Sequence, residues 1–149
     1  MEVNVFRSKI KPNAKLLVEG KEFSVKEVIK FRFDDGTYYV KCFLSGGYVF
    51  ADDEESNSYI LVKPIETPFE EPFPESLEFM GKRLDFLFTA RATAEETFGE
   101  EIFKKGESEK FWDFKAADGS YLSLGINDQT AERADDFGKI IAPDQVALR

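Results

Sequence analysis

The chain has 149 residues, of which 42% are hydrophobic and 15% aromatic, and its 29 Asp and Glu against 20 Lys and Arg give a net charge of −9. This apolar content is enough to bury the core of one domain, which excludes a globally disordered chain. The acidic balance disfavours nucleic-acid binding and docking to anionic lipid, because both need clustered Lys and Arg.

The near absence of cysteine and the absence of histidine limit the metal-binding and catalytic chemistry of the chain. Cys42 is the only cysteine and histidine is absent. Their scarcity excludes an intramolecular disulfide and a cysteine zinc site, and removes the commonest general base. No apolar run approaches membrane-spanning length, and the N-terminus lacks the apolar segment of a signal peptide. We therefore expect a cytoplasmic protein with no membrane insertion, no metal and no cofactor.

The first third of the chain predicts strands. Residues 1–11 alternate weakly, which predicts a short edge strand or a loose arm. Residues 16–18 and 22–33 alternate polar and apolar side chains more clearly, and the slip at Glu27-Val28 indicates a bulge. A short helix from Ser24 is the competing interpretation. We prefer a strand because Asp34-Asp35-Gly36 then forms a tight hairpin turn into the next strand.

The clearest pattern lies between Thr37 and Phe50, where two strands flank Ser45-Gly46-Gly47. Strict alternation places two sets of side chains on opposite faces of the first strand. One face carries Tyr38, Val40, Cys42 and Leu44, and the other carries Tyr39, Lys41 and Phe43. An acidic run, Asp52 to Glu55, ends this hairpin, and residues 59–63 predict a further strand.

Residues 64–76 contain four prolines and predict a strap between two units. Proline lacks an amide donor and fixes φ, so this segment is not expected inside a sheet. A proline-rich recognition motif is the functional alternative. We favour an extended strap held in place by Phe69 and Phe73.

The remaining chain repeats the features of the first part. Gly81-Lys82 opens a strand as Gly20-Lys21 does, and residues 111–128 again combine an aromatic strand, an Asp-Gly turn and a strand led by tyrosine. Residues 94–110 are an insertion, and Thr130 to Asp135 predicts one helical turn. We expect a single all-β domain over residues 1–149, with two pseudo-repeated antiparallel meanders (about 16–64 and 77–148) that form a sandwich or a partly open barrel.

These motifs resemble a known bacterial family over residues 16–148. The Gly-Lys strand openings, the aromatic hairpins and the terminal stretch from Gly138 to Pro143 are similar to the family catalogued as domain of unknown function four-one-seven-eight. Tyr38 and Tyr39 stand where that family has a tryptophan in its first hairpin. The resemblance implies an all-β bacterial domain that serves as an accessory or interaction module, without catalytic residues to carry over.

No residue pattern nominates a catalytic site. A buried structural role is favoured for Cys42, because no base is present to activate the thiol. The run from Asp52 to Glu55 lacks the spacing and the glycine of a calcium loop and is favoured as a solvated loop end. Asp128, Glu132 and Asp135 would share a helical face, and a charged solvent face is again favoured. Among 29 acidic residues no catalytic pair stands out.

The aromatic residues are the most usable functional signal. Core packing is the favoured role for most of them, and the candidate surface for a ligand or partner is Tyr39, Tyr48, Trp112 and Tyr121. Adjacent Phe111 and Trp112 point to opposite faces of a regular strand, so one needs cover from the strap, the insertion or a partner. We expect a non-enzymatic binding or protein-interaction module that uses a sheet edge or an aromatic cleft. The alternatives are a small-molecule-binding β-barrel, a hydrolase or isomerase that uses carboxylates, and a structural homo-oligomer.

Overall fold

The computed structural model describes all residues, 1–149, and consists mostly of β-strands, with one short α-helix packed against their outer face. The elements are, in chain order, α1 (Val3–Lys9), β1 (Lys15–Val18), β2 (Lys21–Phe33), β3 (Tyr38–Leu44), β4 (Val49–Asp53), β5 (Ser58–Pro64), β6 (Ser76–Phe79), β7 (Lys82–Gly99), β8 (Ser108–Lys115), β9 (Ser120–Asn127), β10 (Asp136–Ile141) and β11 (Val146–Leu148). The prediction of an all-β chain is confirmed.

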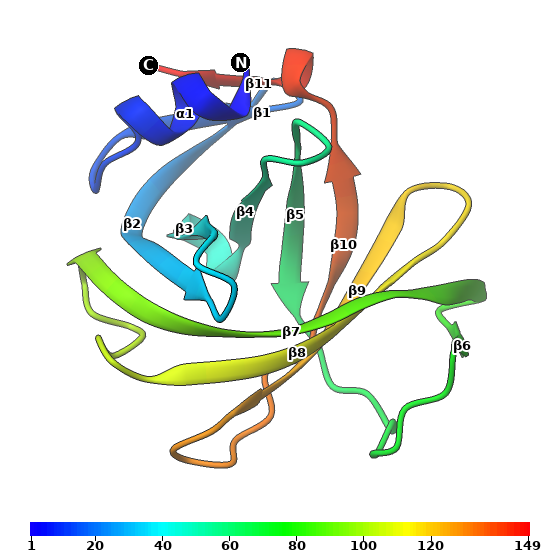
Figure 1. Cartoon of the computed structure of the whole chain (residues 1–149). Helices are drawn as coiled ribbons and strands as arrows, with labels where there is room; N and C mark the ends of the chain where they lie inside the picture. Colours follow the sequence, from blue (N-terminus) through cyan, green and yellow to red (C-terminus); the bar gives the residue numbers. More distant parts are fainter.

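Eight of the strands form a closed antiparallel barrel (Figure 1). The order around the barrel is β2-β3-β4-β5-β10-β9-β8-β7, and β7 pairs with β2 to complete the ring. The prediction of a sandwich or a partly open barrel is therefore corrected to a closed barrel. Closure depends on the lengths of β2 and β7, because each long strand also pairs at its N-terminal end with a short strand, β1 or β6. The internal repeat stays a prediction.

The inside of the barrel is identified by rings that meet across it. The Tyr39 and Phe111 ring centroids are 6.1 Å apart, although β3 and β8 are not neighbours in the sheet. Directly paired residues of antiparallel strands share a face, and the interior residues Ile29 and Phe31 pair with Lys41 and Tyr39. Phe43, two residues beyond Lys41, therefore also lies inside. The interior apolar cluster consists of Ile29, Phe31, Ala92, Ala94 and Phe111.

Two further apolar clusters cover the outer face of the barrel. The larger includes Val40, Cys42 and Phe50 and is covered by α1, β1 and β11. The smaller includes Leu122 and Leu124 and is covered by β6 and by residues of the proline-rich segment. This layered arrangement explains why both faces of β3 and β8 are apolar in the sequence.

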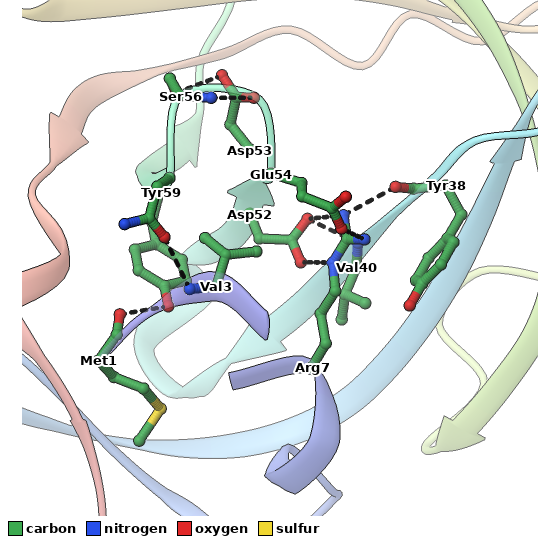
Figure 2. A network of polar contacts seen from close by, with 11 residues as sticks. Met1, Val3, Arg7, Tyr38, Val40, Asp52, Asp53, Glu54, Ser56 and Tyr59 are labelled. Carbon is green, nitrogen blue, oxygen red and sulfur yellow. Dashed lines mark hydrogen bonds and ion pairs between the residues drawn. The ribbon is translucent and has the colours of Figure 1, made fainter. Parts of the chain in front are cut away.

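The N-terminal segment is the main departure from the predicted elements. Residues 1–11 were expected to form an edge strand or a loose arm, and residues 3–9 instead form α1. Val3 and Phe6 lie one turn apart, so both can face the same surface, and both are buried against the barrel. Figure 2 shows how Arg7 and the backbone of Met1 and Val3 bind β3, β4, β5 and the β4–β5 loop beside them.

The proline-rich segment, residues 65–75, runs outside the barrel between β5 and β6. The Phe73 ring lies edge-on to the Trp112 ring at 4.9 Å, and Phe69 packs against Phe79. Phe111 faces the interior while its neighbour Trp112 faces outward, so this segment supplies the cover that Trp112 requires.

Three smaller expectations also have outcomes. The register of β2 shifts between Val25 and Glu27, which confirms a bulge next to the position predicted. Residues 94–99 extend β7, and residues 100–107 form a loop before β8. The helical turn expected from Thr130 to Asp135 does not form, because Arg133 makes an isolated bridge with Ile126 there.

None of the helices has the length and apolar composition needed to cross a membrane.

Candidate binding site inside the barrel

A hollow of about 300 Å³ lies at one end of the barrel interior. Its wall combines aromatic and aliphatic side chains with charged ones, an unusual mixture for the inside of a small barrel. The lining side chains from the strands include Lys41, Phe43, Val49, Glu109 and Asp136; Phe103 and residues 133–135 come from loops. An eight-stranded barrel is wide enough to hold one small ligand where side chains do not fill it.

Lys41 reaches the hollow because it lies between Tyr39 and Phe43 on the inward face of β3. Its Nζ atom lies 5.6 Å from the Phe31 ring centroid and 5.5 Å from the Phe43 ring centroid. These distances allow cation–π attraction. No carboxylate lies within ion-pairing distance of this ammonium group, so its charge faces the hollow without a protein partner.

Glu109 is the most buried charged group of the wall. It is only 7% exposed, and its carboxylate accepts no hydrogen bond from the protein. Gly125, on the neighbouring strand β9, makes room for it, because a Cβ atom at this position would lie 2.2 Å from Glu109 Oε1. A buried carboxylate without donors is costly, and this cost falls if a bound molecule supplies them.

Asp136, at the start of β10, is a second carboxylate without a hydrogen-bond donor. Burial raises its pKa to about 6, against a smaller lowering effect from Lys41. Glu109 and Asp135 add repulsion and raise the pKa further. Asp136 therefore exchanges its proton close to neutral pH.

Asp113 lies deeper in the same interior, and its carboxylate is satisfied by the protein. It accepts hydrogen bonds from the hydroxyls of Tyr121 and Ser123, the latter at 2.6 Å. Burial raises the pKa of Asp113 to about 7 in spite of these donors and of nearby Lys41. This network links β8 to β9, and it borders the charged wall.

The loop of residues 100–107 covers this end of the barrel with Phe103. The Phe103 ring packs edge-on against Phe31 at 5.1 Å, and its backbone N–H donates to Glu27 Oε2 at 3.2 Å. Glu27 is fully buried, and its other oxygen, Oε1, has no partner. Burial raises the pKa of Glu27. Further hydrogen bonds hold the two ends of the loop, because Glu100 N–H donates to the carbonyl of Lys26 and Gly106 N–H donates to the carbonyl of Ala94. Phe103 thus attaches the middle of the loop to the barrel.

Arg133, at the rim, is already paired. Its guanidinium binds Asp135 through Nε and Nη2, and its Nη1 donates to the carbonyl of Phe69 at 2.8 Å. Asp135 also accepts a hydrogen bond from Thr67. The rim pair is thus neutral overall, and the free charges of the site are those of the wall.

The structure separates the four aromatic residues proposed from the sequence. Tyr39 and Tyr121 lie inside the barrel near Asp113, where burial raises the pKa of both phenols. Tyr48 packs outside against Phe23, and Trp112 lies under Phe73. Only the first two are brought together, and a partner surface made of all four stays a prediction.

Two expectations about single residues also have outcomes. Cys42 is fully buried in the outer cluster, which confirms its packing role, and burial raises its pKa. Asp52 was expected in a solvated loop end, and it is instead 7% exposed. The reason is Arg7, whose Nε donates to Asp52 Oδ2 at 2.6 Å while the backbone N–H of Val40 donates to Oδ1 (Figure 2).

Sequence reasoning did not single out Lys41, Glu109 and Asp136. A signal was present for Lys41, which falls on a strand face that is otherwise aromatic, and a weaker one for Glu109. Lys41 lies between Tyr39 and Phe43 on one face of β3, whereas Glu109 shares its face of β8 with a single aromatic residue, Phe111, and with Asp113. Asp136 carried no such signal, since its strand follows a polar loop.

The fold and the site together define a small, closed antiparallel β-barrel with a charged hollow. Comparison of the chain with family models, with curated proteins and with solved structures gives no match in any of the three. The resemblance to the bacterial family of unknown function therefore stays a prediction.

Proposed function

We propose that this protein binds a small molecule inside the barrel. The observation that carries the proposal is a hollow of about 300 Å³ whose wall holds Lys41, Glu109 and Asp136 without protein partners. Glu109 is buried, and Lys41 and Asp136 are half-buried. Charges removed from water are ordinarily paired, because their desolvation is otherwise uncompensated. A ligand with complementary polar groups would provide the missing partners.

The size and lining of the hollow agree with this function. Ligand pockets start at about 300 Å³ and combine apolar walls with a few polar groups that set orientation. Phe43, Val49 and Phe103 supply the apolar part of the wall here. The hollow therefore suits a compact molecule with few non-hydrogen atoms, rather than a lipid or a peptide.

The test is a thermal-shift panel with four classes of small probe: aliphatic amines, carboxylates, amino acids and simple sugars. We expect at least one class to raise the melting temperature of the wild type, and Glu109→Gln to abolish that rise. The matched control is Glu78→Gln, an exposed glutamate on β6. The proposal is overturned if no class stabilises the protein, or if the rise is the same in both variants.

A second candidate, recognition of an extended segment of a partner protein, is favoured by one stretch of β7. β6 pairs with β7 only as far as Asp85, and β2 pairs with it from Ala92 onward. The same edge of residues 87–91 thus has no strand beside it, and Leu87 there is 49% exposed. Unpaired strand edges with apolar side chains recruit further strands.

A pull-down with Leu87→Lys tests this candidate. We expect a partner retained by the wild type to be lost with this variant, because a charged side chain disfavours strand pairing on an apolar edge. Met80→Lys is the control, since Met80 is also exposed, at 63%, but lies in the β6–β7 turn. Equal retention by both variants would exclude the β7 edge as the contact.

A further inference from the structure

We infer that the molecule bound in the barrel is an organic cation, a small amine or guanidine whose positive group lies between Glu109 and Asp136. This inference rests on the proposed function, because it names the class of ligand for the same hollow. It follows from the charges of the wall, from the two carboxylates without donors and from the aromatic side chains around them.

The interior is acidic once its charges are counted. Glu109, Asp113 and Asp136 face one ammonium group, that of Lys41. Arg133 adds no free positive charge, because Asp135 binds it in a two-pronged ion pair. A ligand with a positive charge would therefore be attracted, whereas an anion would meet Glu109 and Asp136, and Asp113 whenever it is ionised.

Hydrogen bonding points to the same class. Glu109 is 7% exposed, lines the hollow and accepts no hydrogen bond. A ligand that pairs with this carboxylate must therefore donate hydrogen bonds to it. Asp136 is half-buried and likewise accepts no hydrogen bond, whereas Asp113 is already satisfied by Tyr121 and Ser123. An ammonium or guanidinium group donates several hydrogen bonds and accepts none, which matches two carboxylates without donors.

The rest of the wall favours an organic cation over a metal ion. No group of three or more carboxylate or other ligating side chains has an arrangement that could hold a metal. Phe43 and Phe103 instead offer aromatic surface beside the carboxylates. Such surface stabilises both the cationic head, through cation–π attraction, and an attached hydrocarbon portion.

The ammonium group of Lys41 should weaken the binding of a cation in the hollow. Its ammonium group offsets part of the carboxylate charge, as its lowering effect on the pKa of Asp136 indicates. A bound cation has to compete with that ammonium group. Loss of the Lys41 charge is therefore expected to tighten cation binding, although it removes a polar side chain from the site.

The experiment compares probes with the same carbon frame and different charge. The first series is putrescine, butanediol and succinate, and the second is phenethylamine, phenylethanol and phenylacetate. Binding is measured by isothermal titration calorimetry and by chemical-shift changes in the amide spectrum. We expect saturable binding of the amines alone, with shifts at residues of β3, β8 and β10.

Variants then locate the charge. Glu109→Gln and Asp136→Asn should each weaken amine binding by about tenfold or more, the effect of losing a ~1.4 kcal/mol interaction. Lys41→Met should strengthen it, and exposed Glu78→Gln should leave it unchanged. Unfolding curves for each variant confirm that the barrel is intact before affinities are compared.

The outcomes separate the two proposals. If the alcohols or acids bind and Glu109→Gln weakens them, the cation assignment is wrong and binding inside the barrel stands. If Lys41→Met weakens amine binding as much as Glu109→Gln does, the cation assignment is also wrong. If no probe in either series binds, and the broader thermal-shift panel is negative too, both proposals fail.

Discussion

Asp136 is a carboxylate that folding half-buries without giving it a hydrogen-bond donor. Burial, followed by repulsion from Glu109 and Asp135, raises its pKa to about 6, while Lys41 opposes the rise. An unfolded Asp has a pKa of about 3.9. Between these two values the folded protein keeps a proton that the unfolded chain has lost, so the folded state binds more protons.

The sign of the pH effect follows from this difference. The contribution of Asp136 to stability is fully present below about pH 4 and is lost as the pH rises through 6. We expect the Asp136→Asn variant to lose less stability than the wild type between these values, and to be the more stable protein at pH 8. The difference should be on the order of 1–3 kcal/mol, since one pKa unit corresponds to ~1.4 kcal/mol.

Urea unfolding at a series of pH values provides the measurement. Asp144→Asn serves as the matched control, because Asp144 is an exposed carboxylate in the turn before β11. Asp113, whose pKa is about 7, remains in both proteins and contributes the same slope to each. Parallel curves for wild type and Asp136→Asn would contradict the assignment of this proton to Asp136.

α1 is an element that local sequence preference cannot stabilise by itself. It has only seven residues, and isolated helices of that length do not form stably in water. Its stability comes from Phe6, whose ring packs against Phe50 at 5.6 Å and Tyr59 at 5.3 Å, and from Arg7. Arg7 forms an ion pair with Asp52, whose side chain is fully buried, and also binds Glu54 and the carbonyl of Tyr38 (Figure 2).

Replacement of Arg7 by Met should lower the free energy of unfolding by about 3–5 kcal/mol. The physical reason is that Asp52 would remain buried with its charge uncompensated, which costs more than the ion pair itself is worth. The additional change Asp52→Asn should recover most of the loss. Denaturant unfolding of the single and double variants measures both effects.

Arg83→Met is the matched control for this helix contact. Arg83 also forms an ion pair, with Asp85, but its side chain is 70% exposed. Exposed pairs contribute about 0–1 kcal/mol, so this variant should be nearly as stable as the wild type. An equal effect of the two substitutions would show that the buried contact between α1 and β4 is not a special source of stability.

At the scale of the whole molecule, ring closure creates the site. Lys41, Glu109 and Asp136 belong to β3, β8 and β10, three strands that are not neighbours in the sheet. They face one hollow because β2 pairs with β7 and β5 pairs with β10. The β5–β10 contact is close at Gly138, where a Cβ atom would lie 2.0 Å from the carbonyl oxygen of Leu61. A side chain at this position would push apart the two strands.

Closure of the barrel leaves one stretch of the β7 edge, residues 87–91, without a paired strand. The strand is longer than either of its partners on that edge, so β6 and β2 together do not cover it. The barrel interior and this edge are therefore two separate places at which function can be sought. The binding of small cations and the loss of a partner with Leu87→Lys test them independently.

The first strands and the turns between them were determined by the sequence alone. Alternation with a period of two, together with the Gly-containing turns after Phe33 and Leu44, defines the β2–β3–β4 meander, because local backbone geometry carries this information. The slip near Glu27 was visible for the same reason. Single-strand alternation also showed that either Phe111 or Trp112 needs cover, without deciding which of the two.

Only the tertiary structure decided the closed ring, the helix and the charged hollow. β2 meets β7 through pairs such as Glu27 with Gly99, which no local pattern connects. Phe6 and Arg7 become helical because the outer face of β3, β4 and β5 offers Phe50, Tyr59 and Asp52 as partners. Lys41, Glu109 and Asp136 likewise form one site only because strand pairing places their three strands around the same interior. Alternation assigns a side chain to a face, and the pairing of distant strands determines which face encloses a cavity.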